Sequence, residues 1–243
     1  MQMKLFEGKD DNLIFGTDGR KSIVAEVLGR LFIFVCLLIS VFVLGFTITY
    51  NTAPVYGVSM QPTLNAIGGT KNDTVYINKF SKGDYGDVIV LKIVDGGETT
   101  YIIKRLIGKS GDRINVKADT QGNIAVYRNG KALVENYILD IKQCGDPNNL
   151  GMKSTLADFD ILRDRALAGE IDNVTFNVDG ELVLSDNQVF VLGDNRGYSI
   201  DSADDGPFIV DNIEGRVDYI LPYGENSIVF FLERFTGIQW LKK

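Results

Sequence analysis

The chain has 243 residues, a formal net charge of -7 and no histidine, and these features exclude several classes of function. Without an imidazole it is neither a Ser-His-Asp nor a Cys-His enzyme and has no histidine-based zinc site, so a nucleophilic enzyme of this sequence needs lysine or a carboxylate as its base. The negative charge and the lack of a basic patch predict no nucleic-acid partner.

The first predicted element is a membrane anchor. Residues 31–48 read LFIFVCLLISVFVLGFTI without a charge, and at about 1.5 Å per residue such a run roughly spans the ~30 Å hydrocarbon core of a bilayer. A buried core helix and a cleavable signal sequence are the alternatives. We interpret residues 28–49 as a transmembrane helix that is not cleaved off. It follows a tail, residues 1–27, of which the first 21 are expected to be mobile.

Basic residues near the anchor predict its orientation. No lysine or arginine follows the apolar run until Lys71, whereas three lie close before it: Arg20, Lys21 and Arg30. The positive-inside rule then predicts a single pass through the cell membrane, with a cytoplasmic N-terminus. Everything after about Tyr50 is expected on the extracytoplasmic side.

Most of the exported part predicts β-structure. Runs rich in valine, isoleucine and tyrosine indicate strands at 73–80, 87–94, 100–107, 189–192 and 217–221. Asn129-Gly130 indicates a hairpin turn between strands at 124–128 and 132–135.

One helix is expected in this part, with Thr155 as its N-cap and Gly169 at its end. Residues 228–243 are expected to form a terminal core strand, or alternatively to touch a membrane interface through Phe235 and Trp240.

The three motifs described below avoid one long segment of the exported part. We therefore predict a catalytic β-domain formed by residues 50–117 and 186–243, with a second β-rich domain, residues 118–185, inserted into it.

The first motif, residues 56–64, begins a few residues after the anchor. Ser59 has small or apolar neighbours and is followed by Pro62, which suits a rigid exposed turn, although serine is common in turns. No charged side chain occurs from residue 31 to residue 70. We therefore expect this loop to work against an apolar partner or the lipid surface.

The second motif, residues 101–108, lies on a predicted strand. Alternation places Lys104 on one face with Ile102 and Leu106. If that face points to the core, desolvation lowers the pKa of the lysine, as a lysine base requires. The alternatives are that Arg105 points inward instead, or that Lys104 extends its ammonium group to solvent.

The third motif follows the predicted strand 189–192 and reads GDNRGYSIDSADDG over residues 193–206. So many polar residues at a strand end suit a hydrogen-bonded scaffold. A surface turn or a calcium-binding loop is the alternative, although the spacing of the aspartates is not that of an EF-hand.

Together and in this order, the three motifs resemble the bacterial type I signal peptidases, serine proteases of the S26 family that use a Ser/Lys dyad. The matching segments are GVSMQPTL (57–64), YIIKRLIGKSGD (101–112) and GDNRGYSIDS (193–202). The resemblance implies a mainly β fold: a signal-peptidase-like catalytic β-domain, an inserted second domain and one N-terminal transmembrane helix. It also implies a membrane-bound endopeptidase that removes signal peptides from exported preproteins after small residues.

The resemblance also implies roles for single residues. Ser59 corresponds to the nucleophile, Lys104 to the general base, and Ser199 to the serine that orients the lysine. Asp201 corresponds to a supporting carboxylate. The Ser59 N–H would be one oxyanion donor, and Gly57 stands where some relatives have a serine that supplies the second, so that donor comes from the backbone or is absent.

Further residues are expected around the dyad. Met60, Ile102 and Ile103 are expected to line the substrate cleft. Asp194 and Arg196 are expected to support the site.

One departure from the family pattern affects Asp201. The pattern continues Asp-Ser-Arg, but here Ala203 replaces the arginine that usually pairs with the aspartate. A buried carboxylate needs partners, which leaves Arg196, another cation, backbone N–H groups or partial hydration. We expect Arg196, because arginine can bind a carboxylate with two hydrogen bonds.

The implied partners are signal peptides of secreted preproteins, the lipid bilayer and, functionally, the secretion translocon. No cofactor and no metal are expected. Two rivals remain: a catalytically silent relative that binds extended segments, and a LexA-like self-cleaving regulator that also uses Ser and Lys. The presence of both Ser59 and Lys104 argues against the first, and the anchor argues against the second.

Overall fold

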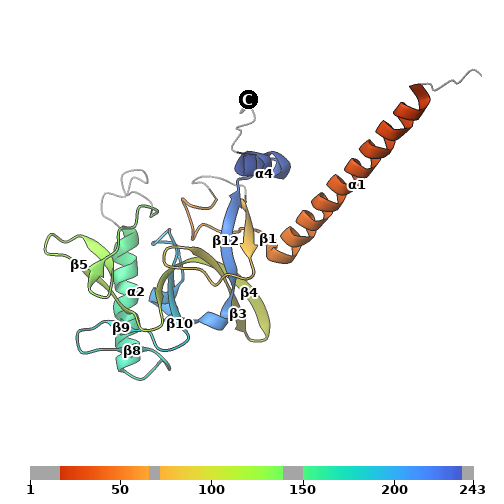
Figure 1. Ribbon diagram of the computed structural model, residues 1–243. Coiled ribbons are helices and arrows are strands. Elements are labelled where there is room, and N and C mark those ends of the chain that lie inside the picture. Colours follow the sequence, from red (N-terminus) through yellow and green to blue (C-terminus); the bar gives the residue numbers. More distant parts are fainter. Residues whose placement is uncertain (1–16, 66–71, 139–149, 237–243) are drawn as a thin grey trace, which may run out of the picture. The chain divides into compact units, whose positions relative to one another are not determined.

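The computed structural model describes residues 17–65, 72–138 and 150–236. The chain forms two compact units, residues 1–48 and residues 49–243, and each is described by itself. The elements are labelled in Figure 1.

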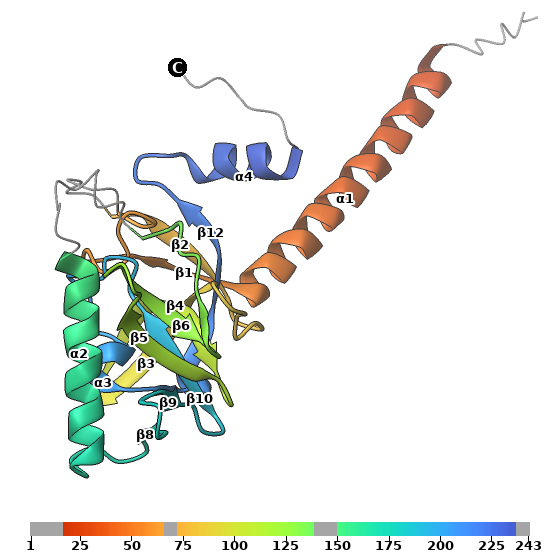
Figure 2. The ribbon, with the colours of Figure 1, turned by 90° about the vertical axis from the view of Figure 1, so that its left-hand side faces the viewer.

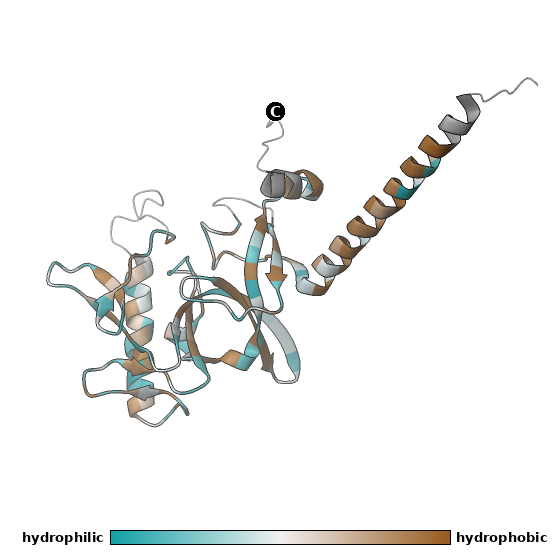
Figure 3. Cartoon of the chain, in the orientation of Figure 1, coloured by the Kyte–Doolittle hydropathy of each residue, from teal (hydrophilic) through white to brown (hydrophobic). Residues whose placement is uncertain are grey.

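The first unit consists of the helix α1, Thr17–Thr49. Its part from Ile23 to Thr49, 27 residues, is long and apolar enough to cross a membrane, since it rises roughly 40 Å. The helix is mostly apolar (Figure 3). Its apolar side chains are exposed, as at Phe32 (69%), so it is not the core helix of a globular fold. The expected mobile tail is wrong for residues 17–21, which are helical, and residues 1–16 lie outside the described part.

The second unit is built on a seven-stranded antiparallel sheet. Its strands, in spatial order, are β1 (Tyr50–Pro54), β2 (Thr74–Asn78), β12 (Ile213–Leu221), β3 (Val88–Asp95), β4 (Glu98–Lys109), β10 (Gln188–Leu192) and β11 (Phe208–Ile209). All strands predicted for this sheet are present, and the short strands β1 and β11 were not predicted.

The pairing of β3 with β4 determines where Lys104 points. Lys104 lies opposite Ile89, and Ile102 lies opposite Leu91. Directly opposed residues share a face of the sheet, and Ile89 and Leu91 are fully buried. The predicted alternation is therefore confirmed, because Lys104 lies on a core-facing side of its strand.

A second antiparallel sheet has five short strands. In spatial order they are β7 (Lys131–Ala132), β6 (Ile124–Arg128), β5 (Arg113–Ala118), β9 (Leu182–Val183) and β8 (Thr175–Phe176). The helix α2 (Leu150–Leu167) runs beside this sheet (Figure 2). The hairpin at Asn129-Gly130 is confirmed, whereas β5, β8 and β9 were not predicted.

The two sheets share one hydrophobic cluster. The ring of Phe159 on α2 lies 6.2 Å from that of Phe190 on β10, measured between centroids, and both side chains are fully buried. The second sheet begins at Arg113, a few residues before the predicted boundary at 118. The separate inserted domain, residues 118–185, stays a prediction.

Three smaller helices complete the unit: α3 (Ser202–Asp205), the 3-10 turn η1 (Val210–Asn212) and α4 (Ser227–Thr236). The predicted terminal strand is wrong, because α4 is helical. Asn226 accepts the backbone N–H of Ile228 at 2.9 Å and caps the helix. Phe231 packs edge-on against Tyr76 at 4.8 Å between centroids. The side chain of Phe235, and Trp240 altogether, lie outside what the structure describes.

The predicted N-cap of α2 is also wrong. The helix begins at Leu150, so Thr155 lies within it. Its hydroxyl donates to the carbonyl of Gly151 at 3.1 Å, as a threonine in a helix interior does. On this helix, the side chains of Phe159 and Leu162 are fully buried.

Candidate active site

Residues 55–65 follow β1 and form the loop of Ser59, called the nucleophile loop after the role expected of that serine. A side chain at the end of this loop closes it. Asn65 donates through Nδ2 to the carbonyls of Val55 at 2.8 Å and Gly57 at 3.0 Å. Its Oδ1 accepts the N–H of Asp73 at 2.8 Å. Asn65 is buried, so these bonds do not compete with water. The sequence analysis missed this residue, although it directly follows the motif that contains Ser59.

The side chain of Lys104 on β4 reaches Ser59. Lys104 Nζ lies 3.2 Å from Ser59 Oγ, and the lysine is 5% exposed. Burial lowers the pKa of Lys104 from 10.5, while the charges of Asp201 and Asp204 act in the opposite direction. The expected desolvated lysine is therefore present, and a larger share of its amine is neutral than for a lysine in water.

Residues 193–201 form a second loop, called the catalytic loop, which is hydrogen-bonded to the nucleophile loop. The N–H of Asn195 donates to the carbonyl of Ser59 at 2.9 Å. Its side-chain Nδ2 donates to the carbonyl of Val58 at 3.1 Å. Asn195, which the sequence analysis quoted within a motif but did not single out, therefore fixes the backbone at Val58 and Ser59.

Asp194 supports the loops through a buried ion pair. Its side chain is fully buried, and Arg105 Nε donates to Oδ1 at 2.8 Å. Thr63 of the nucleophile loop also donates to this carboxylate. Both neighbours on β4 thus point into the protein, Lys104 towards apolar residues and Arg105 towards Asp194. The sequence analysis treated an inward-facing Lys104 and an inward-facing Arg105 as alternatives. They exclude each other only when one face of the strand is exposed to solvent.

Asp201 is hydrogen-bonded by backbone N–H groups rather than paired with an arginine. It accepts the N–H of Gly193 at 2.8 Å and that of Ala203 at 3.1 Å, the second as the N-cap of α3. Asp204 accepts the N–H of Asp201 in return at 3.0 Å. Burial raises the pKa of Asp201, and these bonds, a nearby Ser199 hydroxyl and Lys104 oppose that rise.

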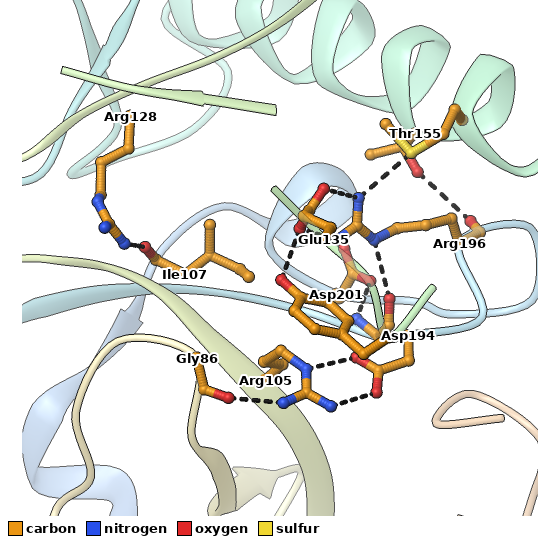
Figure 4. A network of polar contacts seen from close by, with 12 residues as sticks. Gly86, Arg105, Ile107, Arg128, Glu135, Thr155, Asp194, Arg196 and Asp201 are labelled. Carbon is orange, nitrogen blue, oxygen red and sulfur yellow. Dashed lines mark hydrogen bonds and ion pairs between the residues drawn. The ribbon is translucent and has the colours of Figure 1, made fainter. Parts of the chain in front are cut away.

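The expected pairing of Arg196 with Asp201 is wrong. The Arg196 guanidinium binds the carboxylate of Glu135 with two nitrogens, Nη1 to Oε2 at 3.0 Å and Nη2 to Oε1 (Figure 4). A buried arginine takes the carboxylate within its reach, and Asp201 already accepts two N–H groups. Asp194 is thus paired with an arginine, and Asp201 is hydrogen-bonded by the backbone. Among the described residues, no three side chains that could ligate a metal ion lie together.

Ser199 lies where a lysine-orienting serine is expected. Its hydroxyl is buried and makes no hydrogen bond of normal geometry within the described ranges. The Cα of Gly193 faces it so closely that a β-carbon there would lie 2.2 Å from Ser199 Oγ. The Ser199 hydroxyl lies near the Asp201 carboxylate and favours its charged form.

The residues expected to line a substrate cleft differ in their burial. Met60 is 2% exposed and packs into a buried hydrophobic cluster with Val55 and Leu64, so its place in the substrate cleft stays a prediction. Ile102 and Ile103 are half-buried and pack on opposite faces of β4. Gly57 is exposed with φ +89°, and a β-carbon there would meet nothing within 4 Å.

A serine hydroxyl beside a buried, partly neutral lysine is the arrangement of hydrolases that use lysine in place of histidine as base. The geometry of the site is therefore the one expected of a Ser/Lys hydrolase.

Comparison with known proteins narrows this class. A family model described as "Signal peptidase, peptidase S26" matches residues 25–222. Signal peptidase I S of Bacillus subtilis (strain 168) is 32% identical over 173 residues, covering 70% of this chain and 76% of the relative. Signal peptidase I of Bacillus licheniformis is 30% identical over 182 residues, covering 73% and 74%.

A crystal structure of a signal peptidase I from Enterococcus faecalis V583 aligns with a TM-score of 0.33 and 22% identity, over 56% of this chain and 96% of that chain. A TM-score this low carries no structural argument. The family match and the curated relatives show that the chain belongs to the signal peptidase family, peptidase S26. It is a serine peptidase, and its family acts on signal peptides of preproteins.

Proposed function

We propose that Ser59 is the nucleophile and Lys104 the general base with which this chain removes signal peptides. The observation that carries the proposal is the 3.2 Å separation of Lys104 Nζ from Ser59 Oγ. This distance is within reach of direct proton transfer. Burial of Lys104, which lowers its pKa, supports the same role.

The chemistry then needs only these two side chains and water. The neutral amine of Lys104 takes the proton of Ser59 Oγ while the oxygen attacks the scissile carbonyl carbon. The ammonium returns that proton to the leaving amine, and an acyl-enzyme remains. Lys104 next takes a proton from a water molecule, which attacks the ester carbonyl carbon. The ammonium then returns this proton to Ser59 Oγ as the acyl group leaves, which restores the serine and the neutral amine.

The surrounding groups have supporting roles in this proposal. The N–H of Ser59 donates no hydrogen bond within the described residues, so it is available as an oxyanion donor. The source of a second donor is not assigned, because Gly57 has no side chain. Ser199 orients the lysine, and Asp201 adds a negative charge that acts on it.

The proposed location follows from α1 and the basic residues before its apolar part. The N-terminus lies in the cytoplasm, and the catalytic unit lies on the extracytoplasmic side. Substrates then reach the enzyme as they emerge from the secretion translocon, with which we propose a functional association. Holding enzyme and substrate on one membrane raises their effective concentration.

Cleavage of a preprotein by the full chain in detergent tests the dyad. Ser59→Ala and Lys104→Arg should abolish turnover, because arginine keeps the charge but does not give up its proton in a protein. Matched controls are Ser110→Ala and Lys109→Arg, which replace an exposed serine and a lysine paired with Asp84 at the far end of β4. Near-normal turnover by Lys104→Arg, or by Ser59→Ala, would disprove the assignment.

A further inference from the structure

Arg196 and Glu135 form an ion pair that water hardly reaches. Their side chains are 3% and 4% exposed. The two residues are 61 positions apart in the sequence, and Glu135 follows β7 in the region predicted as an insertion. A buried charge without its partner is costly, so each of these side chains depends on the other to stay where it is.

Arg196 uses its remaining nitrogen on the catalytic loop. Its Nε donates to the carbonyl of Gly193 at 3.0 Å. The N–H of Gly193 in turn donates to Asp201 at 2.8 Å, and Asp201 acts electrostatically on Lys104. A series of hydrogen bonds therefore runs from Glu135 through Arg196 and Gly193 to Asp201 (Figure 4), and the charge of Asp201 acts on Lys104.

Gly193 also fixes the nucleophile sterically. A β-carbon on Gly193 would lie 2.6 Å from the carbonyl oxygen of Ser59, so the two backbones are in direct contact. Any displacement of Gly193 is passed to Ser59 without an intervening side chain. The position of the Arg196 guanidinium therefore matters to both members of the dyad.

Other side chains of the same region surround this ion pair. The Tyr137 hydroxyl donates to Glu135 at 2.7 Å, and the Tyr137 ring covers the guanidinium of Arg105 at 3.8 Å. Arg196 Nη1 also donates to the sulfur of Met152 on α2 at 3.2 Å. This region thus contacts both arginines that hold the catalytic loop in place.

We propose that Glu135 is a positioning residue for the peptidase reaction, acting through Arg196 and Gly193 on the Ser59/Lys104 dyad. The inference rests on the proposed function of the dyad. The proposal assigns the region after β7 a role in keeping the active-site residues in position, in addition to its part in the shared core.

The test measures kcat, KM, the pH profile and the melting temperature of full-length Glu135→Gln in detergent, with a preprotein as substrate. Glutamine keeps the size and an acceptor for Tyr137 but removes the charge. The matched control is Glu181→Gln, a second carboxylate of the same region, which pairs with Arg113 at 3.6 Å away from the dyad. All rates are taken well below the lowest melting temperature.

We expect Glu135→Gln to lower kcat about tenfold to a hundredfold, because a dyad displaced by a fraction of an ångström loses its attack geometry. KM should change little. The rise of kcat with pH should move upwards, because a loosened loop hydrates Lys104 and returns its pKa towards 10.5. Glu181→Gln should keep the kcat and pH profile of the wild type.

A double variant, Glu135→Gln with Arg196→Met, separates positioning from stability. It leaves no buried charge unpaired, so the melting temperature should recover relative to Glu135→Gln, whereas kcat should stay low because Gly193 has lost its donor. Recovery of kcat together with stability would overturn the proposal, as would a Glu135→Gln variant with the kcat and pH profile of the wild type. If the single variant does not fold, the kcat of the double variant decides alone.

Ser59→Ala in the same assay distinguishes failure of the positioning role from failure of the proposed function. If Ser59→Ala is inactive while both Glu135 variants are normal, the positioning role fails and the dyad stands. If Ser59→Ala still turns over, the proposed function itself fails, and with it the role of Glu135.

Discussion

The closest backbone contact of the site predicts that Gly193→Ala inactivates the enzyme. The new β-carbon would lie 2.2 Å from Ser199 Oγ, 2.5 Å from Ser199 Cβ and 2.6 Å from the carbonyl oxygen of Ser59. The last of these neighbours is backbone and cannot rotate away. A methyl group therefore forces the catalytic loop and the nucleophile loop apart.

The size of the displacement follows from these distances. Ordinary contact begins at 3.4 Å, so the Ser59 carbonyl must withdraw by roughly 0.8 Å. Lys104 Nζ already lies 3.2 Å from Ser59 Oγ, at the long end of hydrogen-bond reach. A shift of this order costs about a hundredfold in kcat, and the overpacking costs about 1–3 kcal/mol of stability.

The assay is preprotein cleavage by full-length Gly193→Ala, with melting measured in parallel. Gly108→Ala is the control, because a β-carbon on Gly108 would lie 2.8 Å from Ile114 Cδ1, the end of a flexible side chain away from the dyad. It should lower the melting temperature and leave kcat unchanged. A Gly193→Ala variant that is destabilised but keeps the kcat of the wild type would refute the reasoning.

Three further predictions follow from charge and burial. Asp201→Asn removes a negative charge that raises the pKa of Lys104, so the rise of kcat with pH should move to lower pH, and an unchanged or upward-shifted profile would contradict this. Protease added to cells with opened walls should digest the part after the anchor and spare residues 1–21; loss of that tail would reverse the assigned orientation. Adding Ala203→Arg to Arg196→Ala should lower the melting temperature further rather than rescue it, because residue 203 is 1% exposed in the core.

The local pattern of the sequence was sufficient for the apolar helix, for the strand that carries Lys104 and for the family. An uncharged run long enough for a bilayer predicted α1, since helix length and side-chain hydropathy are local properties. Strand alternation predicted that Lys104 shares a face with Ile102 and Leu106, because the period of a strand is two wherever the strand lies. The three motifs, read together, predicted the family that the comparisons show.

Other local patterns were insufficient. The segment after Asn226 is apolar enough for a strand, and packing of Phe231 against Tyr76 on the sheet, with a capping side chain, makes it a helix instead. Helix α2 begins before the residue that looked like its cap, because Thr155 finds an acceptor one turn earlier. Neighbours distant in sequence or competing local bonds decided both cases.

Only the tertiary structure decided the partners of the buried charges. The sequence shows that Asp201 lacks the usual arginine, and Arg196 is the nearest cation along the chain. The fold instead brings Glu135 to Arg196 from 61 residues away and turns two backbone N–H groups towards Asp201. A buried ion takes whichever counter-charge the packing places within reach, and that placement depends on how the sheets and α2 meet rather than on proximity in sequence.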